Sequence, residues 1–131
     1  MKYMILMNVT AKDFKAFGAT LGPADLQAHF TFMNTLNQTL KANGEWVVGE
    51  GLSPPDQAKI VRAREGSGQA IVTDGPFAEG KEFLAGFWIV DVKSPERAYE
   101  LAAFISTAPG KDGVPMNFPV ELRPVGEAPE A

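Results

Sequence analysis

The sequence predicts an α+β domain, and three observations carry that prediction. Two stretches repeat apolar residues at the three- and four-residue spacing of an amphipathic helix. Around them lie short apolar or alternating stretches of strand length, separated by Gly and Pro turns. One of these strands is apolar on both faces, which is typical of the middle of a sheet. With 131 residues, 45% of them apolar, the chain can bury one core, and we expect a single domain over residues 1–131.

The first half of the chain predicts a strand, a long helix and a second strand. Residues 3–7 form an apolar run typical of an interior strand, whereas residues 8–22 show no clear pattern. The helix begins at Pro23, where the missing N–H costs nothing, and ends at Asn43, which precedes a glycine. A strand over 45–50 follows. The apolar stripe expected on the helix comprises Leu26, Phe30, Met33, Leu36 and Leu40.

The second half predicts a hairpin, a central strand, a helix and a last strand. Residues 59–64 and 69–73 alternate around a Gly-Ser-Gly turn, as half-exposed hairpin strands do. Residues 83–92 are apolar at both odd and even positions, so we expect them at the centre of the sheet. Ser94 followed by proline is an N-cap signal that opens the second helix. Residues 120–123 alternate as the last strand.

Without the hairpin, this order is βαββαβ, the ferredoxin-like arrangement. Its two helices cover one face of the sheet, which leaves the other face open and in need of a partner. We therefore predict a ferredoxin-like α+β domain with an inserted β-hairpin, and a homodimer that covers the open face.

Composition argues against several classes of function. The net charge is −4 and the twelve Lys and Arg residues are scattered, so we expect no nucleic acid and no membrane as partner. The chain has no cysteine, which excludes disulfides and thiol chemistry and fits a cytoplasmic location. Motifs for nucleotides, phosphate loops, zinc proteases and serine hydrolases are missing. We accordingly expect no cofactor and no metal.

The stretch TDGPFAEGKE, residues 73–82, holds most of the candidate site residues. Asp74 before Gly-Pro is typical of a side-chain-capped turn, and alternatively orients a base or holds a substrate proton. Glu79, Lys81 and Glu82 form either a solvated loop or one side of a pocket at the end of the sheet. Phe77 is expected in the core or in a pocket wall.

His29 is the single histidine of the chain. Its position centres it on the apolar stripe of the long helix, facing the sheet. It is either a hydrogen-bonded histidine at the edge of the core or a general base with a pKa near neutrality. Arg62 and Arg64 share one side of the hairpin and are expected near the acids of residues 73–82.

The strings TDGPFAEGKE, LAGFWIVDV, SPERAYELA and VELRPV resemble the DGPF branch of the YCII-related proteins. The resemblance implies a ferredoxin-like subunit that pairs into a dimeric α/β barrel. It also implies proximity to sigma factors of the extracytoplasmic-function class, beside which such genes are often found. Shorter relatives carry a His and an Asp proposed as an acid–base pair. Here those positions hold Met33 and Glu79, with His29 one helical turn before the first.

Two hypotheses follow for the function. In the first, the protein binds a small organic molecule near the DGPF loop, with possible cofactor-free acid–base chemistry. The catalytic residues would then be His29, Asp74 and Glu79, and the ligand contacts are assigned to Phe77, Lys81, Glu82 and Arg64. In the second, it is a non-catalytic homodimer that acts through protein contacts in sigma-factor-linked transcription regulation.

Overall fold

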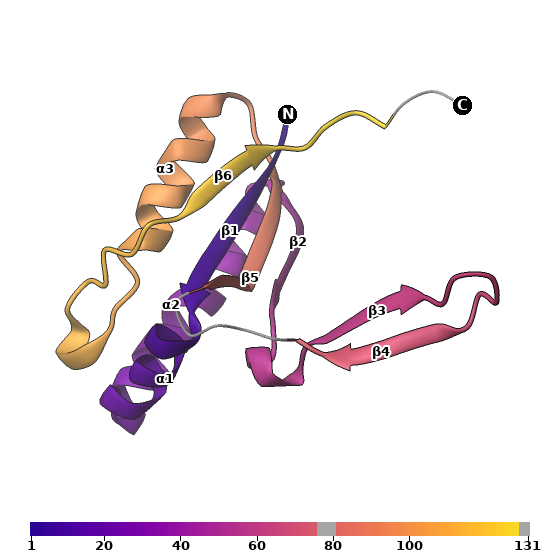
Figure 1. Ribbon diagram of the computed structural model, residues 1–131. Helices are drawn as coiled ribbons and strands as arrows, with labels where there is room; N and C mark the ends of the chain where they lie inside the picture. The colour runs from indigo at the N-terminus through magenta and orange to yellow at the C-terminus, as the bar shows by residue number, and fades with distance from the viewer. Residues whose placement is uncertain (76–80, 129–131) are drawn as a thin grey trace.

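A four-stranded antiparallel sheet forms the centre of the protein (Figure 1). The computed structural model describes residues 1–75 and 81–128. The strands are β1 (Lys2–Thr10), β2 (Trp46–Gly51), β5 (Glu82–Asp91) and β6 (Glu121–Pro124), in the order β2-β5-β1-β6. The first and third strands of the βαββαβ series lie at the centre, as in ferredoxin-like sheets, which confirms the predicted α+β class.

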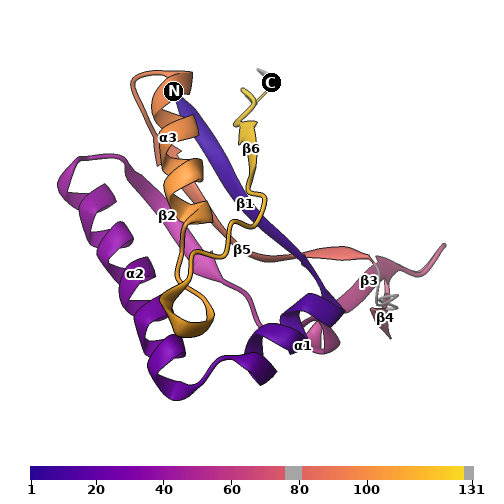
Figure 2. The same cartoon turned by 90° about the vertical axis from the view of Figure 1, so that its left-hand side faces the viewer.

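Helices cover one face of this sheet (Figure 2). They are α1 (Ala11–Thr20), α2 (Pro23–Ala42) and α3 (Pro95–Ser106), of which α2 and α3 follow the sequence prediction. Two single 3-10 turns lie in the connections, η1 (Pro55–Gln57) and η2 (Lys111–Gly113). Within the described residues, no helix is long and apolar enough to cross a membrane.

The helix ends are capped as the sequence indicates. The Asp25 carboxylate accepts a hydrogen bond from the Gly22 backbone N–H at 3.1 Å, which fixes the start of α2. After α2, Gly44 has a φ of +72°, a conformation that glycine adopts without strain. At the start of α3, the Ser94 hydroxyl accepts from the Arg97 backbone N–H at 3.2 Å.

Helix α1 fills the segment that the sequence left without an assignment. The strand before it extends to Thr10, whose hydroxyl accepts from the Asp13 backbone N–H at 3.1 Å and so caps the new helix. Thr10 and Asp13 stand at capping-box spacing, and Phe14 and Phe17 lie one helical turn apart. These signals were available in the sequence, but the helix is short and contains a glycine.

The core lies between the sheet and helices α2 and α3. Its fully buried side chains are Ile5, Leu40, Val90 and Ile105. The Trp88 indole N–H donates to the Asn37 side-chain oxygen at 2.8 Å, which ties β5 to α2 without an unpaired polar group. One prediction for α2 is wrong: Phe30 is 58% exposed, because it lies beside the apolar stripe rather than on it.

The central strand β5 contains a β-bulge, so its side chains do not alternate without interruption as the sequence predicts. Met7 pairs with Gly86 but Asn8 pairs with Leu84, so Ala85 is the extra residue. Beyond the bulge the alternation is reversed. Phe83 therefore turns toward the helices, where its ring lies 5.8 Å from that of Phe14.

The predicted hairpin is present and projects from the body of the protein (Figures 1 and 2). It consists of β3 (Lys59–Ala63) and β4 (Ala70–Asp74), and we call residues 59–74 the arm. Every residue of β3 is exposed, so the expectation of a half-exposed strand is wrong. The described structure places no layer of the body against the arm that could bury one side of it.

The face of the sheet opposite the helices is apolar at its centre, whereas the edge strands β2 and β6 add Glu50 and Arg123. We call it the open face. Its side chains alternate with those of the core along the same strands, and they are half-buried because only their sheet neighbours shield them. Its apolar members are Met4, Leu6, Val48, Phe87 and Ile89.

Candidate functional site

The antiparallel order of the strands divides the sheet into two ends. At one end β1 and β2 finish and β5 and β6 begin. The arm is inserted between β2 and β5, so it leaves the sheet from this end, and the described part of the 73–82 stretch lies there as well. We call it the arm end. The topology thus brings the arm and the described ends of the 73–82 stretch to the same end of the sheet.

His29 lies on the covered face, in the first half of α2. It is 7% exposed, and its Nδ1 lies 3.0 Å from the Pro109 carbonyl oxygen. The rings of Phe17 and Phe30 stand nearly edge-on to the imidazole, with centroids at 5.0 Å and 5.9 Å. Within the described residues, no carboxylate forms a hydrogen bond or ion pair with it. The prediction that His29 faces inward is confirmed.

The bond to Pro109 fixes the tautomer of a neutral His29. A carbonyl oxygen only accepts, so the ring must carry its proton at Nδ1 and keep a lone pair at Nε2. Such a bond satisfies one polar atom of a buried ring and joins α2 to the loop after α3. These contacts favour the structural role for His29, and the acid–base role stays a prediction.

Asp74 ends β4 and lies at the base of the arm. It forms a short ion pair with Lys59, the residue opposite it in β3. The Gly75 N–H donates to the Ala58 carbonyl at 3.3 Å, one residue further along each strand. The carboxylate is largely exposed, so this pair contributes at most about 1 kcal/mol. In the structure, the Lys59–Asp74 pair joins the two strands at the base of the arm.

The remaining predicted residues are spread along the arm end. Lys81 and Glu82 are exposed at the start of β5, and Arg64 is exposed near the tip of the arm. Phe77 and Glu79 lie outside the described residues. Within the described part of the chain, Arg64 forms no ion pair with an acid of the 73–82 stretch.

Helix α1 lies between His29 and the start of β5. Its Phe17 packs on His29, and its Phe14 packs on Phe83 at the start of β5. The helix therefore occupies the space between α2 and the beginning of the central strand. No helix was predicted for residues 8–22, so this separation was not expected from the sequence.

A polar group on the open face was also missed. The Asn8 side-chain N–H donates to a Glu121 carboxylate oxygen at 2.8 Å, joining β1 to β6. Glu82 pairs with Thr10 in the β1–β5 register, and the bulge at Ala85 turns its side chain to the same face. We call Asn8, Glu82 and Glu121 the polar corner. It borders the apolar open face at the arm end.

The polar corner could have been found only with the strand register. Asn8 and Glu121 are 113 residues apart in sequence. Glu82 joins them because the bulge reverses the alternation of β5, and no single-strand pattern announces a bulge.

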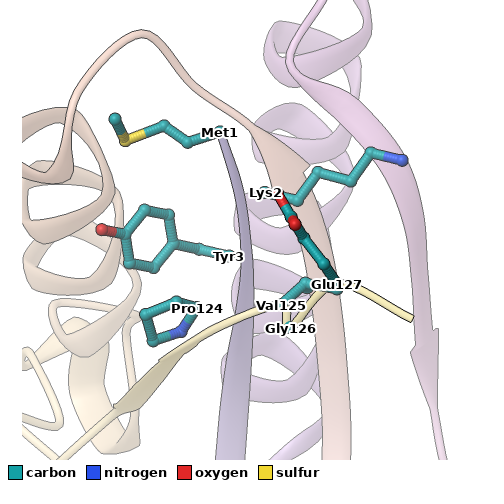
Figure 3. A pocket seen from close by; sticks show the side chains of 7 residues that line it. All are labelled: Met1, Lys2, Tyr3, Pro124, Val125, Gly126 and Glu127. Atoms are coloured by element: carbon teal, nitrogen blue, oxygen red, sulfur yellow. The ribbon is translucent and has the colours of Figure 1, made fainter. Parts of the chain in front are cut away.

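Two hollows on the surface lie at the other end of the sheet. One of about 480 Å³ runs around the start of β1 and the end of β6. Figure 3 shows Tyr3 and Pro124 on one side of β1 and Lys2 and Glu127 on the other, so this hollow is not an enclosed cavity. It contains no residue predicted for the site.

The second hollow, of about 690 Å³, surrounds an ion pair between β2 and α3. Two parallel hydrogen bonds join the Arg97 guanidinium to the Glu45 carboxylate, at 2.9 Å and 3.0 Å. The bond from Arg97 holds the pKa of Glu45 below its usual range and raises that of Arg97. These charges are satisfied by each other, so the hollow offers a ligand no free charge from this pair.

Metal binding finds no support in the described residues. Among residues 1–75 and 81–128, no group of three or more His, Asp or Glu side chains lies close enough to hold an ion.

These features define the class of protein. It is an α+β domain of ferredoxin-like strand order, with an open face and an arm. The family model of the YCII-related domain matches residues 1–118, so the chain belongs to the YCII-related family. It is also similar to a protein of Rhizobium meliloti (strain 1021) that is described as uncharacterised, with 41% identity over 66 residues. That match covers 50% of this chain and 53% of the relative, so the chain spans about half the length of the curated relative it matches.

Proposed function

We propose that the protein is a homodimer that binds a small organic molecule at the arm end of the open face. The observation that carries this proposal is an apolar sheet face bordered by the polar corner. Leu6, Leu84 and Phe87 provide apolar surface, and the side chains of Asn8 and Glu121 provide oriented hydrogen-bonding groups beside it. Small-molecule sites combine these two features.

A second copy is the natural cover for this face. An apolar sheet face left in water is unfavourable, and a two-fold contact between identical faces buries both copies at once. Pairing of this kind is the dimeric α/β barrel that the DGPF-type sequence resemblance implies. The cytoplasmic location predicted from the lack of cysteine belongs to the same proposal.

The polar corner determines the chemistry of the ligand. It presents the carboxylates of Glu82 and Glu121 beside the amide of Asn8. Carboxylates accept hydrogen bonds and attract positive charge. The ligand should therefore carry an apolar body and an amino or hydroxyl group.

The test combines the oligomeric state with ligand binding. We expect sedimentation equilibrium to give a dimer, and thermal-shift and NMR screens to find binders among small aromatic and aliphatic amines or alcohols. Glu82→Gln should weaken a charged amine by about tenfold, since an ion pair is replaced by a neutral contact. Glu96→Gln, at an exposed position of α3 away from the arm, is the matched control and should leave binding unchanged.

Two outcomes would contradict the proposal in different ways. A monomer at every concentration would remove the dimer. A dimer whose binders are indifferent to Glu82→Gln would remove the polar corner as the site. In this proposal His29 is a structural residue. If a screen finds a substrate that the protein converts, a loss of that activity in His29→Asn, with stability retained, would instead support His29 as a base.

A second candidate function rests on a separate observation. Several large apolar side chains of the helical layer and its loops are exposed, and they are Phe30, Tyr99, Phe104 and Val114. Such surface favours the protein-contact hypothesis. Titration of a purified extracytoplasmic-function sigma factor, with Phe104→Ser as the variant, tests it. Saturable binding weakened by the substitution would support this function, and no binding at micromolar concentration would contradict it.

A further inference from the structure

The arm is a two-stranded ribbon without a covering layer among the described residues. Val61 and Val72 are directly opposite each other in the β3–β4 register and are 60% and 58% exposed. Ala63 and Ala70 form the next pair on the same side. One side of the arm is thus a continuous apolar strip, closed at its base by the Lys59–Asp74 ion pair.

A ribbon of this kind is not stable by itself. A single two-stranded hairpin is at best marginally stable in water, and it needs a third strand or a packed face. An exposed apolar ribbon is also a liability for aggregation. We therefore expect a specific surface to cover the apolar strip.

We propose that the strip packs against the open face of a second copy, so that two copies exchange arms. This inference deepens the homodimer proposed above and rests on it. The arm leaves the sheet at the arm end, between the last residue of β2 and the first of β5, and it extends away from the side that carries the helices, toward the side of the open face (Figure 2). A second copy placed on that face meets the arm as well.

The size of the open face supports an exchanged arm. Four strands about 4.8 Å apart and about 17 Å long present on the order of 300 Å² in projection. A stable interface takes about 800 Å² of accessible surface from each partner. The arm adds roughly half as much projected area again to the surface that each copy contributes.

The arm would then also border the proposed ligand site of its partner. The polar corner lies on the open face at the arm end, where the described residues of one chain provide a floor. A wall from the second copy would enclose the ligand. Ligand binding is therefore expected to require the dimer and an intact arm.

The first experiment measures the dimer dissociation constant by sedimentation equilibrium. Val61→Lys and Val72→Lys place a charge in the strip, and each should raise the dissociation constant at least about tenfold, because a lysine in an apolar contact loses its hydration. Thr73→Lys is the matched control on the opposite side of β4, and it should change the constant less than about threefold. All three positions are exposed in a single chain, so the fold should be retained, which circular dichroism checks.

The outcomes separate this inference from the proposed homodimer. A dimer that is unaffected by Val61→Lys and Val72→Lys overturns the exchange and leaves the homodimer standing. A chain that is monomeric at every concentration overturns both. Equal weakening by Thr73→Lys would also overturn the packing of this particular side.

Hydrogen exchange provides a second and independent measurement. Ile89→Lys alters the open face, far from the arm in the strand register. In an exchanged dimer, this variant should lose protection of the β3 and β4 amides by at least about tenfold, since the arm loses its support. Unchanged protection of those amides would mean that the arm is supported by its own chain, and would overturn the exchange.

Discussion

The apolar side chains on the two faces of the sheet are similar in kind, but they are buried to different extents. Ile5 and Val90 on the covered face are fully buried, whereas Leu6 and Ile89, their neighbours in the same strands, are half-buried. The difference arises from the helices α2 and α3, which lie on one face only. A strand that is apolar on both sides therefore has two different packing partners. One is the helical layer of its own chain, and the other, as we propose, is a second copy.

The largest effect on stability is expected for a substitution under the covered face, and it distinguishes this face from the open one. Leu40→Ala should lower the free energy of unfolding by about 2–5 kcal/mol, because it leaves a cavity under the covered face. Ile89→Ala on the open face should cost clearly less in dilute solution. Urea unfolding at several protein concentrations measures both values.

The concentration dependence of the second variant sharpens the comparison. If the open face is covered by a second copy, the cost of Ile89→Ala should grow as protein concentration rises, while that of Leu40→Ala should not. Equal costs at every concentration would mean that the two faces are buried within one chain alike.

A smaller effect is expected where β2 meets the tryptophans of the covered face. A Cβ added at Gly49 would lie 2.8 Å from the Trp88 ring and 2.9 Å from that of Trp46. Gly49→Ala should therefore destabilise the protein by about 1–3 kcal/mol through overpacking. Gly51→Ala, in the same strand but with no heavy atom within 4 Å, is the control and should change stability by about 0.5 kcal/mol or less. Thermal unfolding compares the two, and equal effects would rule out the ring contact as the cause.

His29 permits a test of its structural role on the covered side. His29→Leu leaves the Pro109 carbonyl without its donor and should cost about 1–3 kcal/mol. His29→Asn places an amide N–H near the position of Nδ1 and should recover part of that loss. Denaturant unfolding of the two variants measures the difference. Identical stabilities would show that the hydrogen bond to Pro109 has little weight.

The smallest effect concerns the ion pair at the far end of the sheet, and it depends on pH. Hydrogen bonding to Arg97 lowers the pKa of Glu45 in the folded protein, so the pair stabilises the fold above the ordinary glutamate pKa of about 4.3. This contribution should be lost as the pH falls through the lowered pKa. Since Arg97 is partly exposed, we expect about 1 kcal/mol at pH 7.

The comparison of wild type with Glu45→Gln measures that contribution. Their difference in unfolding free energy should be largest near neutral pH and should shrink as the pH falls below the ordinary glutamate pKa and through the lowered one. Glu65→Gln, at an exposed position of the arm, serves as the control. A difference that stays constant from pH 7 to pH 3 would contradict the assignment to Glu45.

Much of the fold could be predicted from local patterns. Helix α2, helix α3, the hairpin and the central strand were all located within a few residues, because their caps, turns and periodicities are local signals. The prediction that His29 faces the core followed from helical periodicity in the same way. Phe30 was misplaced because one residue of rotation decides whether a ring lies on the stripe or beside it.

Little of the site could be predicted in this way. Asp74 and Glu82 were named from the density of charge in one stretch, but their neighbours come from other strands. Asn8 and Glu121 had no local signal at all, since their contact depends on the β1–β6 pairing. The bulge at Ala85 then decided which side of the sheet Glu82 faces.

The sequence by itself determined the α+β class, the order of the elements, the inward direction of His29 and the membership of the YCII-related family. Helix propensity, caps and alternation act over a few residues, so they can be read along the chain. Tertiary structure alone decided that α1 separates His29 from Phe83, and that one sheet face and the arm lack a cover in the described residues. Those facts depend on contacts between residues far apart in sequence, which local pattern does not encode.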